Sequence, residues 1–262
     1  MIKALFFDID GTLVSFNTHS IPQSTIDALT KAKANGVGIY ISTGRPYPII
    51  NNLGAIRHLI DGYVTTNGAF CFIGDKVISR SPIAPEDVDL VIGKAKEAGF
   101  PCMVVGEKTL TMFNTESDPE IVMKVVRMLN VPGIENELPL GDVLGQGILQ
   151  LTPFISEEQE RRYFSNLDGI ESGRWIPDFA DFTAKGVCKA KGLREIAAYK
   201  GLDIAETMAF GDGGNDLSII KAAGIGVAMG NANPVLKENA DYITTSVDDD
   251  GVYNALRHFN VI

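Results

Sequence analysis

The sequence KALFFDIDGTL at residues 3–13 decides the fold class of this chain. Residues 3–9 form a short apolar run that leads into acidic residues and a glycine, which predicts a buried β-strand. Asp8 and Asp10 lie at the end of that strand, and their side chains point to the same side of it. Gly11 then lets the chain turn sharply. By itself, an Asp-x-Asp-Gly sequence often marks a strand followed by a turn and has no catalytic role. The apolar strand before it and Thr-Leu after it favour a functional site.

Buried strands are also predicted at residues 37–42 and 62–66, and a helix at 22–35 separates the first two strands. Strands and helices alternate again from residue 183. Such alternation predicts an α/β core, with a Rossmann-like parallel sheet and helices on both faces. Ligands of these sheets bind beyond the carboxyl ends of the strands, where Asp8, Thr43 and Asn67 all fall.

The middle of the chain has a different pattern. A proline-rich linker is followed by helices and paired strands, which predicts an α+β insert with an antiparallel sheet. We therefore expect a catalytic core of residues 1–81 and 181–262, interrupted by a cap domain of residues 82–180.

Composition narrows the class of partner. The 262 residues carry a formal net charge of −10, which disfavours nucleic acid and anionic membranes. A phosphate site must then be built locally from a metal, a few cations and backbone N–H groups. The three cysteines are far apart, which argues against a zinc site or disulfides. With no signal-peptide profile and no apolar run long enough to span a bilayer, a cytoplasmic protein is expected.

The two strand-end acids suit phosphoryl chemistry. An ionised carboxylate held near a metal can act as a nucleophile. A neighbouring acid feels a like charge, which raises its pKa and lets it hold a proton for a leaving group. Asp8 and Asp10 are the candidates for these two roles.

A second motif, Ser-Thr43-Gly44-Arg45-Pro, closes the strand at 37–42. A hydroxyl and a glycine before a helix start form an anion cradle. Arg45 adds a planar donor for phosphate or a substrate oxygen. Alone, this motif is an ordinary helix cap beside a surface arginine.

Two further motifs lie in the last third of the chain. Lys185 precedes a helix expected at 186–200, where a lysine can place charge on a phosphoryl group. The loop GDGGND at 211–216 packs Asp212, Asn215 and Asp216 among glycines, and such oxygen donors suit Mg²⁺. A lone lysine is usually just solvated, whereas this acid pattern is rare in plain glycine-rich loops.

These four motifs, in this order, resemble those of the haloacid dehalogenase superfamily of phosphohydrolases. DIDGT matches the first motif, Thr43 the second, Lys185 the third and GDGGND the fourth. The size and pattern of the insert resemble the cap of the Cof-type hydrolases, many of which act on sugar phosphates. Thr-Asn67-Gly-Ala resembles a loop of the same subgroup.

The resemblance implies that Asp8 attacks phosphorus and that Asp10 protonates the leaving oxygen, then takes a proton from water. Thr43 and Lys185 would hold the phosphoryl group. Mg²⁺ would bind the Asp8 carboxylate, the Asp10 carbonyl and the Asp212 carboxylate.

The resemblance also implies supporting roles. Asn215 would contact the phosphate, and Asp216 would orient Lys185 or a metal-bound water. Gly44, Arg45 and Asn67 would complete the substrate-binding set. Arg174 or Trp175 could line the cap's substrate surface or serve only in packing.

The expected function is therefore Mg²⁺-dependent hydrolysis of a small phosphate monoester, with a sugar phosphate as the preferred substrate class. A phosphotransferase or mutase would use the same aspartyl-phosphate and stays open. A receiver domain is disfavoured by the insert and by Asp10. A catalytically dead binder is disfavoured by the intact set of acids.

Overall fold

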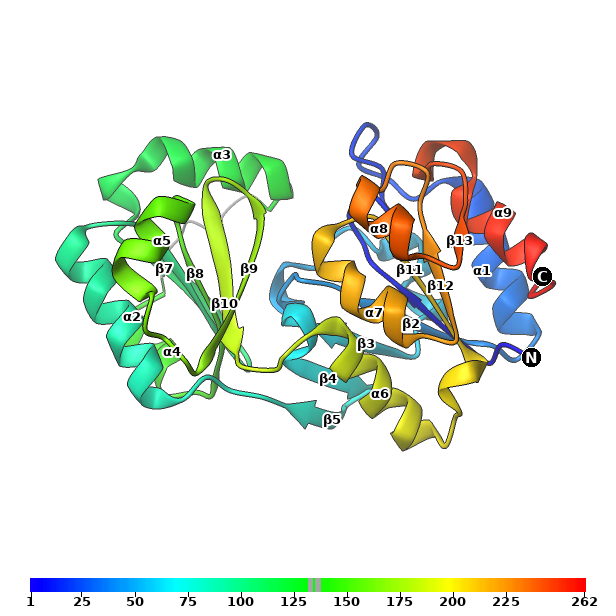
Figure 1. Ribbon diagram of the computed structural model, residues 1–262, viewed down its shortest axis with the longest axis horizontal. Helices are drawn as coiled ribbons and strands as arrows, with labels where there is room; N and C mark the ends of the chain where they lie inside the picture. Colours follow the sequence, from blue (N-terminus) through cyan, green and yellow to red (C-terminus); the bar gives the residue numbers. More distant parts are fainter. Residues whose placement is uncertain (132–133, 135–137) are drawn as a thin grey trace. The chain divides into compact units, whose positions relative to one another are not determined.

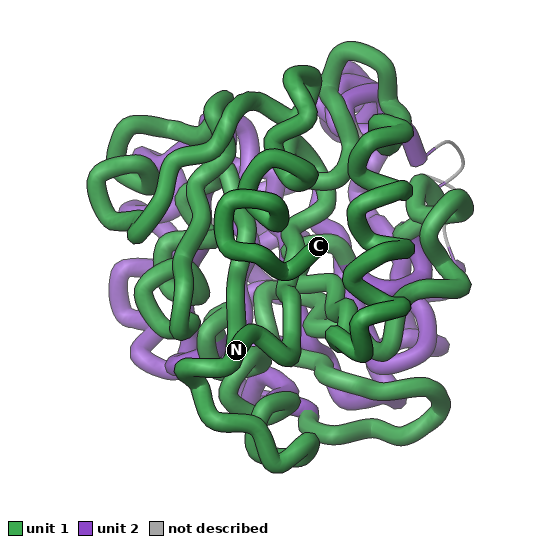
Figure 2. Tube along the Cα trace, turned by 90° about the vertical axis from the view of Figure 1, so that its right-hand side faces the viewer, with its two compact units in different colours: residues 1–45, 50–79, 188–262 green, residues 46–49, 80–187 purple. Residues whose placement is uncertain are grey.

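The computed structural model describes residues 1–131, 134 and 138–262 (Figure 1). The chain forms two compact units, coloured separately in Figure 2. The first comprises Met1–Arg45, Ile50–Ser79 and Cys188–Ile262, and the second comprises Pro46–Ile49 and Arg80–Val187. Of the described residues, no helix is both long enough and apolar enough to cross a membrane.

The first unit is organised around the larger sheet. Its strands are β1 (Ala4–Phe7), β2 (Gly38–Ser42), β3 (Gly62–Thr65), β4 (Phe70–Ile73), β5 (Lys76–Arg80), β11 (Thr207–Gly211), β12 (Ile225–Ala228) and β13 (Tyr242–Ile243). The described residues place them in the order β13-β12-β11-β1-β2-β3-β4-β5. Pairs from β13 to β3 are parallel, and β3 pairs with β4 antiparallel.

Helices cover both faces of this sheet. They are α1 (Gln23–Ala34), α6 (Lys189–Lys200), α7 (Leu217–Ala222), α8 (Pro234–Asn239) and α9 (Gly251–His258). Figure 1 shows α1 and α9 on one side of the strands and α6, α7 and α8 on the other. The predicted α/β core, a parallel-dominated Rossmann-like sheet between helices, is confirmed.

The centre of the sheet is closely packed where the site is built. Every side chain of β1 is fully buried, as expected for a strand covered on both faces. Phe7 of β1 stacks on Phe210 of β11, with ring centroids 4.6 Å apart. This contact fixes the two strand ends that precede Asp8 and Asp212.

The second unit carries an antiparallel sheet. Its described strands, in the order β7-β6-β8-β10-β9, are β6 (Cys102–Gly106), β7 (Leu110–Phe113), β8 (Ile148–Pro153), β9 (Ile170–Ile176) and β10 (Phe179–Ala184). All four neighbouring pairs are antiparallel. The predicted α+β insert with an antiparallel sheet is thus confirmed.

Helices of the second unit pack on both faces of that sheet. They are α2 (Pro85–Ala98), α3 (Pro119–Leu129), α4 (Leu140–Leu144) and α5 (Glu157–Phe164). One apolar cluster joins α2 and α5 to Val104 and Phe182, and a second joins α3 to Met103 and Val105. Successive side chains of β6 point to opposite faces of the sheet, so Val104 packs in the first cluster while Met103 and Val105 pack in the second.

Strand β10 was not predicted, although it lies in the second unit, which ends at Val187. Polar side chains within β10 interrupt the apolar run by which a buried strand is recognised in a sequence. Asp181 is nearly buried because it accepts hydrogen bonds from Gln150 and Thr152, each of 2.8 Å, on neighbouring β8.

Arg174 of β9 is held inside the second unit. Its guanidinium donates to the carbonyls of Ile155, Pro177 and Phe179 and to the Glu160 carboxylate. These contacts all lie within the second unit, and a role for Arg174 at the substrate surface stays a prediction. The side chain of Trp175 lies outside what the structure describes.

Candidate active site

The first acids of the site come from neighbouring strand ends. Asp8 follows β1 and Asp212 follows β11, and these two strands run parallel in register. The Asp8 backbone N–H donates to the Phe210 carbonyl at 3.1 Å. Because parallel strands end at the same sheet edge, both carboxylates emerge side by side.

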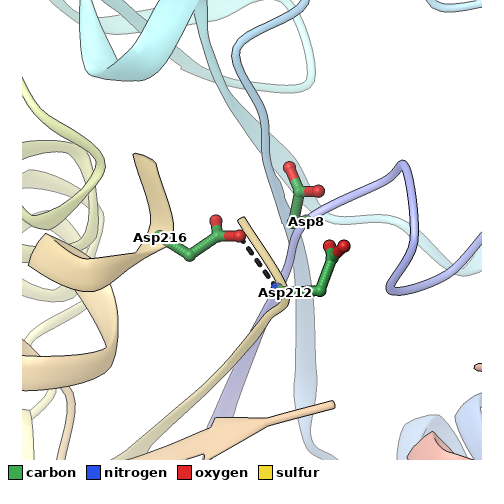
Figure 3. Close-up of side chains that lie close together, drawn as sticks. All are labelled: Asp8, Asp212 and Asp216. Atoms are coloured by element: carbon green, nitrogen blue, oxygen red, sulfur yellow. Dashed lines mark hydrogen bonds between the residues drawn. The ribbon is translucent and has the colours of Figure 1, made fainter. Parts of the chain in front are cut away.

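Three carboxylates gather at this edge (Figure 3). One oxygen from each of Asp8, Asp212 and Asp216 lies within 4.8 Å of the others. Asp216 is fully buried and Asp8 is nearly so. Such proximity of like charges in a buried place is costly unless positive charge compensates it.

Gly11 makes the close approach possible. Its φ of +86° is a left-handed conformation that favours glycine. A Cβ at this position would lie 2.2 Å from the Asp212 carboxylate. The glycine of the first motif therefore serves the turn and also leaves room for the acid that follows β11.

Lys189 is the cation beside the acids. Its Nζ lies 2.6 Å from Asp8 Oδ1 and 2.6 Å from Asp216 Oδ1, and the side chain is fully buried. Burial alone would lower the pKa of Lys189, but the Asp216 and Asp8 carboxylates together raise it above its ordinary value. Lys189 is therefore charged throughout the neutral range.

The lysine beside Asp8 in the structure is Lys189, whereas the motif in the sequence pointed to Lys185. Lys185 is exposed and lies in the second unit just after β10, where its backbone N–H donates to the Gly169 carbonyl. The expected helix began at residue 186, whereas α6 begins at Lys189 itself. No motif in the sequence marks Lys189, because its role depends on α6 beginning at that residue.

Asp216 supports the site from behind. Its Oδ2 accepts hydrogen bonds from the backbone N–H groups of Asp212 at 3.0 Å and Gly213 at 2.9 Å, while Oδ1 binds Lys189. Asp216 thus orients Lys189, whereas the expectation was that it orients Lys185 or a metal-bound water. It also fixes the loop that carries Asp212 (Figure 3).

The electrostatics of the acids follow from burial and crowding. Burial raises the pKa of Asp8 to about 7, against the opposing effect of Lys189. Burial, followed by the charges of Asp8 and Asp216, raises the pKa of Asp212 to about 8. One buried lysine is thus too little positive charge for three carboxylates.

The donor set fits a hard divalent cation. Asp8 and Asp212 offer carboxylate oxygens, which Mg²⁺ prefers, and their raised pKa values mark a deficit of positive charge. Asp216 has both oxygens engaged by protein donors, so it is the least suited of the three to hold a metal. This agrees with its expected supporting role.

Thr43 and Gly44 follow β2 beside Asp8. Thr43 is buried, and its Oγ1 accepts from the Arg45 backbone N–H at 3.0 Å. A Cβ on Gly44 would lie 3.1 Å from the Asn67 side chain and 3.4 Å from that of Asn215. Asn215 donates to Asn67 Oδ1 at 3.1 Å, so both predicted asparagines lie beside Gly44.

Arg45 and Asp10 are paired, which the sequence did not indicate. Arg45 Nε lies 2.6 Å from Asp10 Oδ2, and its NH2 group lies 2.8 Å from Oδ1. The expectation was that Arg45 binds phosphate or a substrate oxygen. The structure shows a two-pronged ion pair between a buried arginine and a partly exposed aspartate, and binding of Arg45 to a substrate stays a prediction.

Two further side chains, Thr12 and Asn231, contact the site and were not singled out from the sequence. Thr12, within the first motif, is buried and donates to Asp212 Oδ1 at 3.1 Å. Asn231 donates to the Gly11 carbonyl and accepts from the Val247 N–H, which ties the first-motif turn to the segment that precedes α9. Thr12 belongs to the first motif, DIDGT, and could have been chosen from the sequence, whereas Asn231 lies outside all four motifs.

Comparison with known proteins now decides the family. The family model of haloacid dehalogenase-like hydrolases matches residues 5–256. This chain belongs to that family. The acids, lysine and hydroxyl described above occupy its core unit, at the carboxyl ends of the parallel strands.

Relatives of this hydrolase cover its whole length. The solved structure of BT4131, described as a HAD subclass IIB sugar phosphatase, superimposes with a TM-score of 0.91 at 47% identity, over 99% of this chain and 100% of that one. YkrA of Bacillus subtilis, which is described as a phosphatase, is 33% identical, and the match covers 99% of this chain and 98% of YkrA. The 5-amino-6-(5-phospho-D-ribitylamino)uracil phosphatase YcsE of the same organism is 27% identical, with 98% and 96% covered.

Proposed function

We propose that this hydrolase is a Mg²⁺-dependent phosphatase that removes phosphate from a sugar phosphate through an aspartyl-phosphate on Asp8. The observation that carries the proposal is the buried contact of Asp8 with Lys189 inside the acid cluster. The similarity to BT4131 supports a sugar phosphate as the substrate class.

The first half-reaction transfers the phosphoryl group to the enzyme. A carboxylate oxygen of Asp8 forms a bond to phosphorus as the ester P–O bond breaks, and Asp10 gives its proton to the leaving oxygen. Lys189, in place of the expected Lys185, neutralises charge on the transferring group, and Thr43 donates to its oxygens.

The second half-reaction releases phosphate. A water oxygen attacks phosphorus, its proton passes to Asp10, and the bond between phosphorus and Asp8 breaks. The sum is one ester and one water giving one alcohol and inorganic phosphate, with both aspartates restored. Mg²⁺ bound by Asp8 and Asp212 would neutralise charge on the phosphoryl oxygens.

The remaining predicted residues belong to binding. Asn215 and Asn67 lie beside Gly44, where they would contact phosphate or substrate oxygens. Arg45 is left out of this set, because its guanidinium is committed to Asp10.

The test is phosphate release from a panel of sugar phosphates, nucleotides and cofactor phosphates, with Mg²⁺ and with EDTA. We expect a sugar phosphate to be the best substrate, EDTA to stop release, and Asp8→Asn to be folded and inactive. Full activity in EDTA, or in folded Asp8→Asn, would refute the proposed chemistry. A panel in which nucleotides are preferred would refute the substrate class alone.

A further inference from the structure

Asp10 is bound by Arg45 through both of its carboxylate oxygens. The two contacts, 2.6 Å to Oδ2 and 2.8 Å to Oδ1, have the forked geometry of the strongest arginine–carboxylate pairs. The Arg45 side chain is 6% exposed and that of Asp10 is 28% exposed. The pair therefore has a buried donor and an acceptor that solvent or substrate can still reach.

Arg45 is itself held from several directions. Its backbone N–H donates to Thr43 Oγ1 at 3.0 Å, and its carbonyl accepts from the Thr66 N–H at 3.2 Å. Thr66 has a φ of +53°, which is unfavourable for a β-branched residue. Backbone strain of this kind persists only where the surroundings impose it. The backbone of Arg45 is thus held on both sides, and its side chain is buried.

Asp10, in contrast, depends on Arg45 for its orientation. Both described bonds to its carboxylate oxygens come from Arg45. Each carboxylate oxygen has two acceptor positions, so the fork leaves one on each oxygen for a proton. Arginine donates only and keeps its charge, so it cannot itself exchange a proton with a substrate.

We propose that Arg45 is a positioning residue, which holds the Asp10 carboxylate in the orientation for proton transfer and does not bind the substrate phosphate. This inference rests on the proposed function, because it concerns the two proton transfers assigned to Asp10. Misplacing such a group by about 1 Å costs about 10²-fold in rate. The forked contact removes that freedom before the substrate arrives.

A double-mutant cycle separates this role from direct phosphate binding. We expect Arg45→Met to lower kcat/KM for the best sugar phosphate by about 10- to 100-fold, and Asp10→Asn to lower it by about 10²–10⁴-fold. Adding Arg45→Met to Asp10→Asn should then cost almost nothing more, because the group that Arg45 positions is gone. An equal loss in both backgrounds would overturn the inference.

Arg45→Lys is the conservative variant. A lysine keeps the positive charge but cannot fork two carboxylate oxygens, so we expect it to behave like Arg45→Met. A lysine binds phosphate well as a point charge. Rescue by Arg45→Lys would therefore indicate direct phosphate binding and would contradict the proposal. The melting temperature of each variant, measured with Mg²⁺, restricts the comparison to folded protein.

Comparing two leaving groups distinguishes positioning of Asp10 by Arg45 from a purely structural role of Arg45, which would affect both substrates equally. A sugar alkoxide needs a proton to leave, whereas p-nitrophenolate does not, and kcat/KM reports the steps up to phosphorylation of Asp8. We expect Arg45→Met to leave kcat/KM for p-nitrophenyl phosphate within about threefold of wild type, because acid catalysis is not needed there. Equal losses for both substrates would overturn the inference.

Product inhibition completes the test. The inhibition constant of inorganic phosphate should be the same for wild type and Arg45→Met if Arg45 makes no contact with phosphate. A clear rise in that constant would refute the inference while leaving the proposed function intact. Wild-type enzyme that hydrolyses no member of the panel would instead refute the proposed function.

Discussion

Lys189 Nζ lies 2.6 Å from Asp8 Oδ1 and 2.6 Å from Asp216 Oδ1, with no exposed surface on the lysine. The ammonium therefore joins the end of β1 to the loop after β11. A buried charge triad of this kind is stable only while all its members are present. The same contact places positive charge next to the oxygen proposed to attack phosphorus.

Replacing Lys189 by methionine should remove both effects. We expect a loss of about 3–5 kcal/mol in the free energy of unfolding in EDTA, because two buried carboxylates lose their partner. In Mg²⁺, the folded variant should lose about 10²–10³-fold in kcat. Denaturant unfolding and phosphate release check the two effects.

Lys185→Met is the matched control for that experiment. Lys185 is exposed and its described contact is through the backbone, so stability and kcat should both change little. A large loss of kcat in Lys185→Met, with near-normal kcat in Lys189→Met, would restore the lysine first chosen from the sequence and reject the one chosen from the structure.

Gly11→Ala should damage the site through a single methyl group. The new Cβ would lie 2.2 Å from the Asp212 carboxylate, so that acid must move. Gly36 has a similar φ of +79° but open space around its would-be Cβ. Both substitutions carry a backbone cost of about 1–2 kcal/mol.

Only Gly11→Ala should also lose phosphatase activity and weaken the stabilisation by Mg²⁺. Melting curves with and without Mg²⁺, together with phosphate release, compare the two variants. Equal activity in Gly11→Ala and Gly36→Ala would show that the position of Asp212 does not matter.

Stability without metal should fall as the pH rises. The pKa values of Asp8 and Asp212 are raised to about 7 and about 8, whereas aspartate in the unfolded chain ionises near its ordinary value. The folded state therefore holds more protons than the unfolded state between about pH 4 and pH 8, so folding becomes less favourable across that window.

A metal should reverse this trend, because it replaces protons at the same oxygens. We expect the rise in melting temperature caused by Mg²⁺ to be larger at pH 8 than at pH 6. Melting curves in EDTA and in Mg²⁺ across this range provide the measurement. A metal-free melting temperature that increases steadily from pH 5 to pH 8 would contradict the prediction.

Asp212→Asn and Asp216→Asn should change stability in opposite directions. Above its pKa of about 8, Asp212 is crowded by like charges, so at such a pH a neutral amide should raise the metal-free melting temperature and abolish the response to Mg²⁺. Asp216 accepts from Lys189 and from two backbone N–H groups, so the amide should destabilise by about 1.5–3 kcal/mol. Shifts of the same sign in both variants would refute these assignments.

The strand ends were predictable from sequence because parallel strands impose the geometry. Hydrophobic runs locate β1 and β11, and the residues after them, Asp8 and Asp212, must then share one edge of the sheet. The spacing of the fourth motif likewise places Asp216 one short turn beyond Asp212, where its carboxylate can reach back to the loop. Local rules suffice for these residues.

The rest depended on packing that local rules do not encode. The choice between Lys185 and Lys189 turns on where α6 begins, and helix ends are poorly defined by sequence. The pairing of Arg45 with Asp10 joins side chains 35 positions apart, which no motif spacing reveals. β10 was missed because Asp181 finds its partners on another strand.

The most direct test of the account is to look for phosphate on Asp8 during turnover. The enzyme with Mg²⁺ is mixed with excess sugar phosphate, stopped with acid within milliseconds to seconds, digested and analysed by mass spectrometry. We predict a phosphoryl adduct on Asp8 that is absent from Asp8→Asn and disappears when the substrate is exhausted. Rapid phosphate release with no adduct on Asp8, or with the adduct on another residue, would contradict the account.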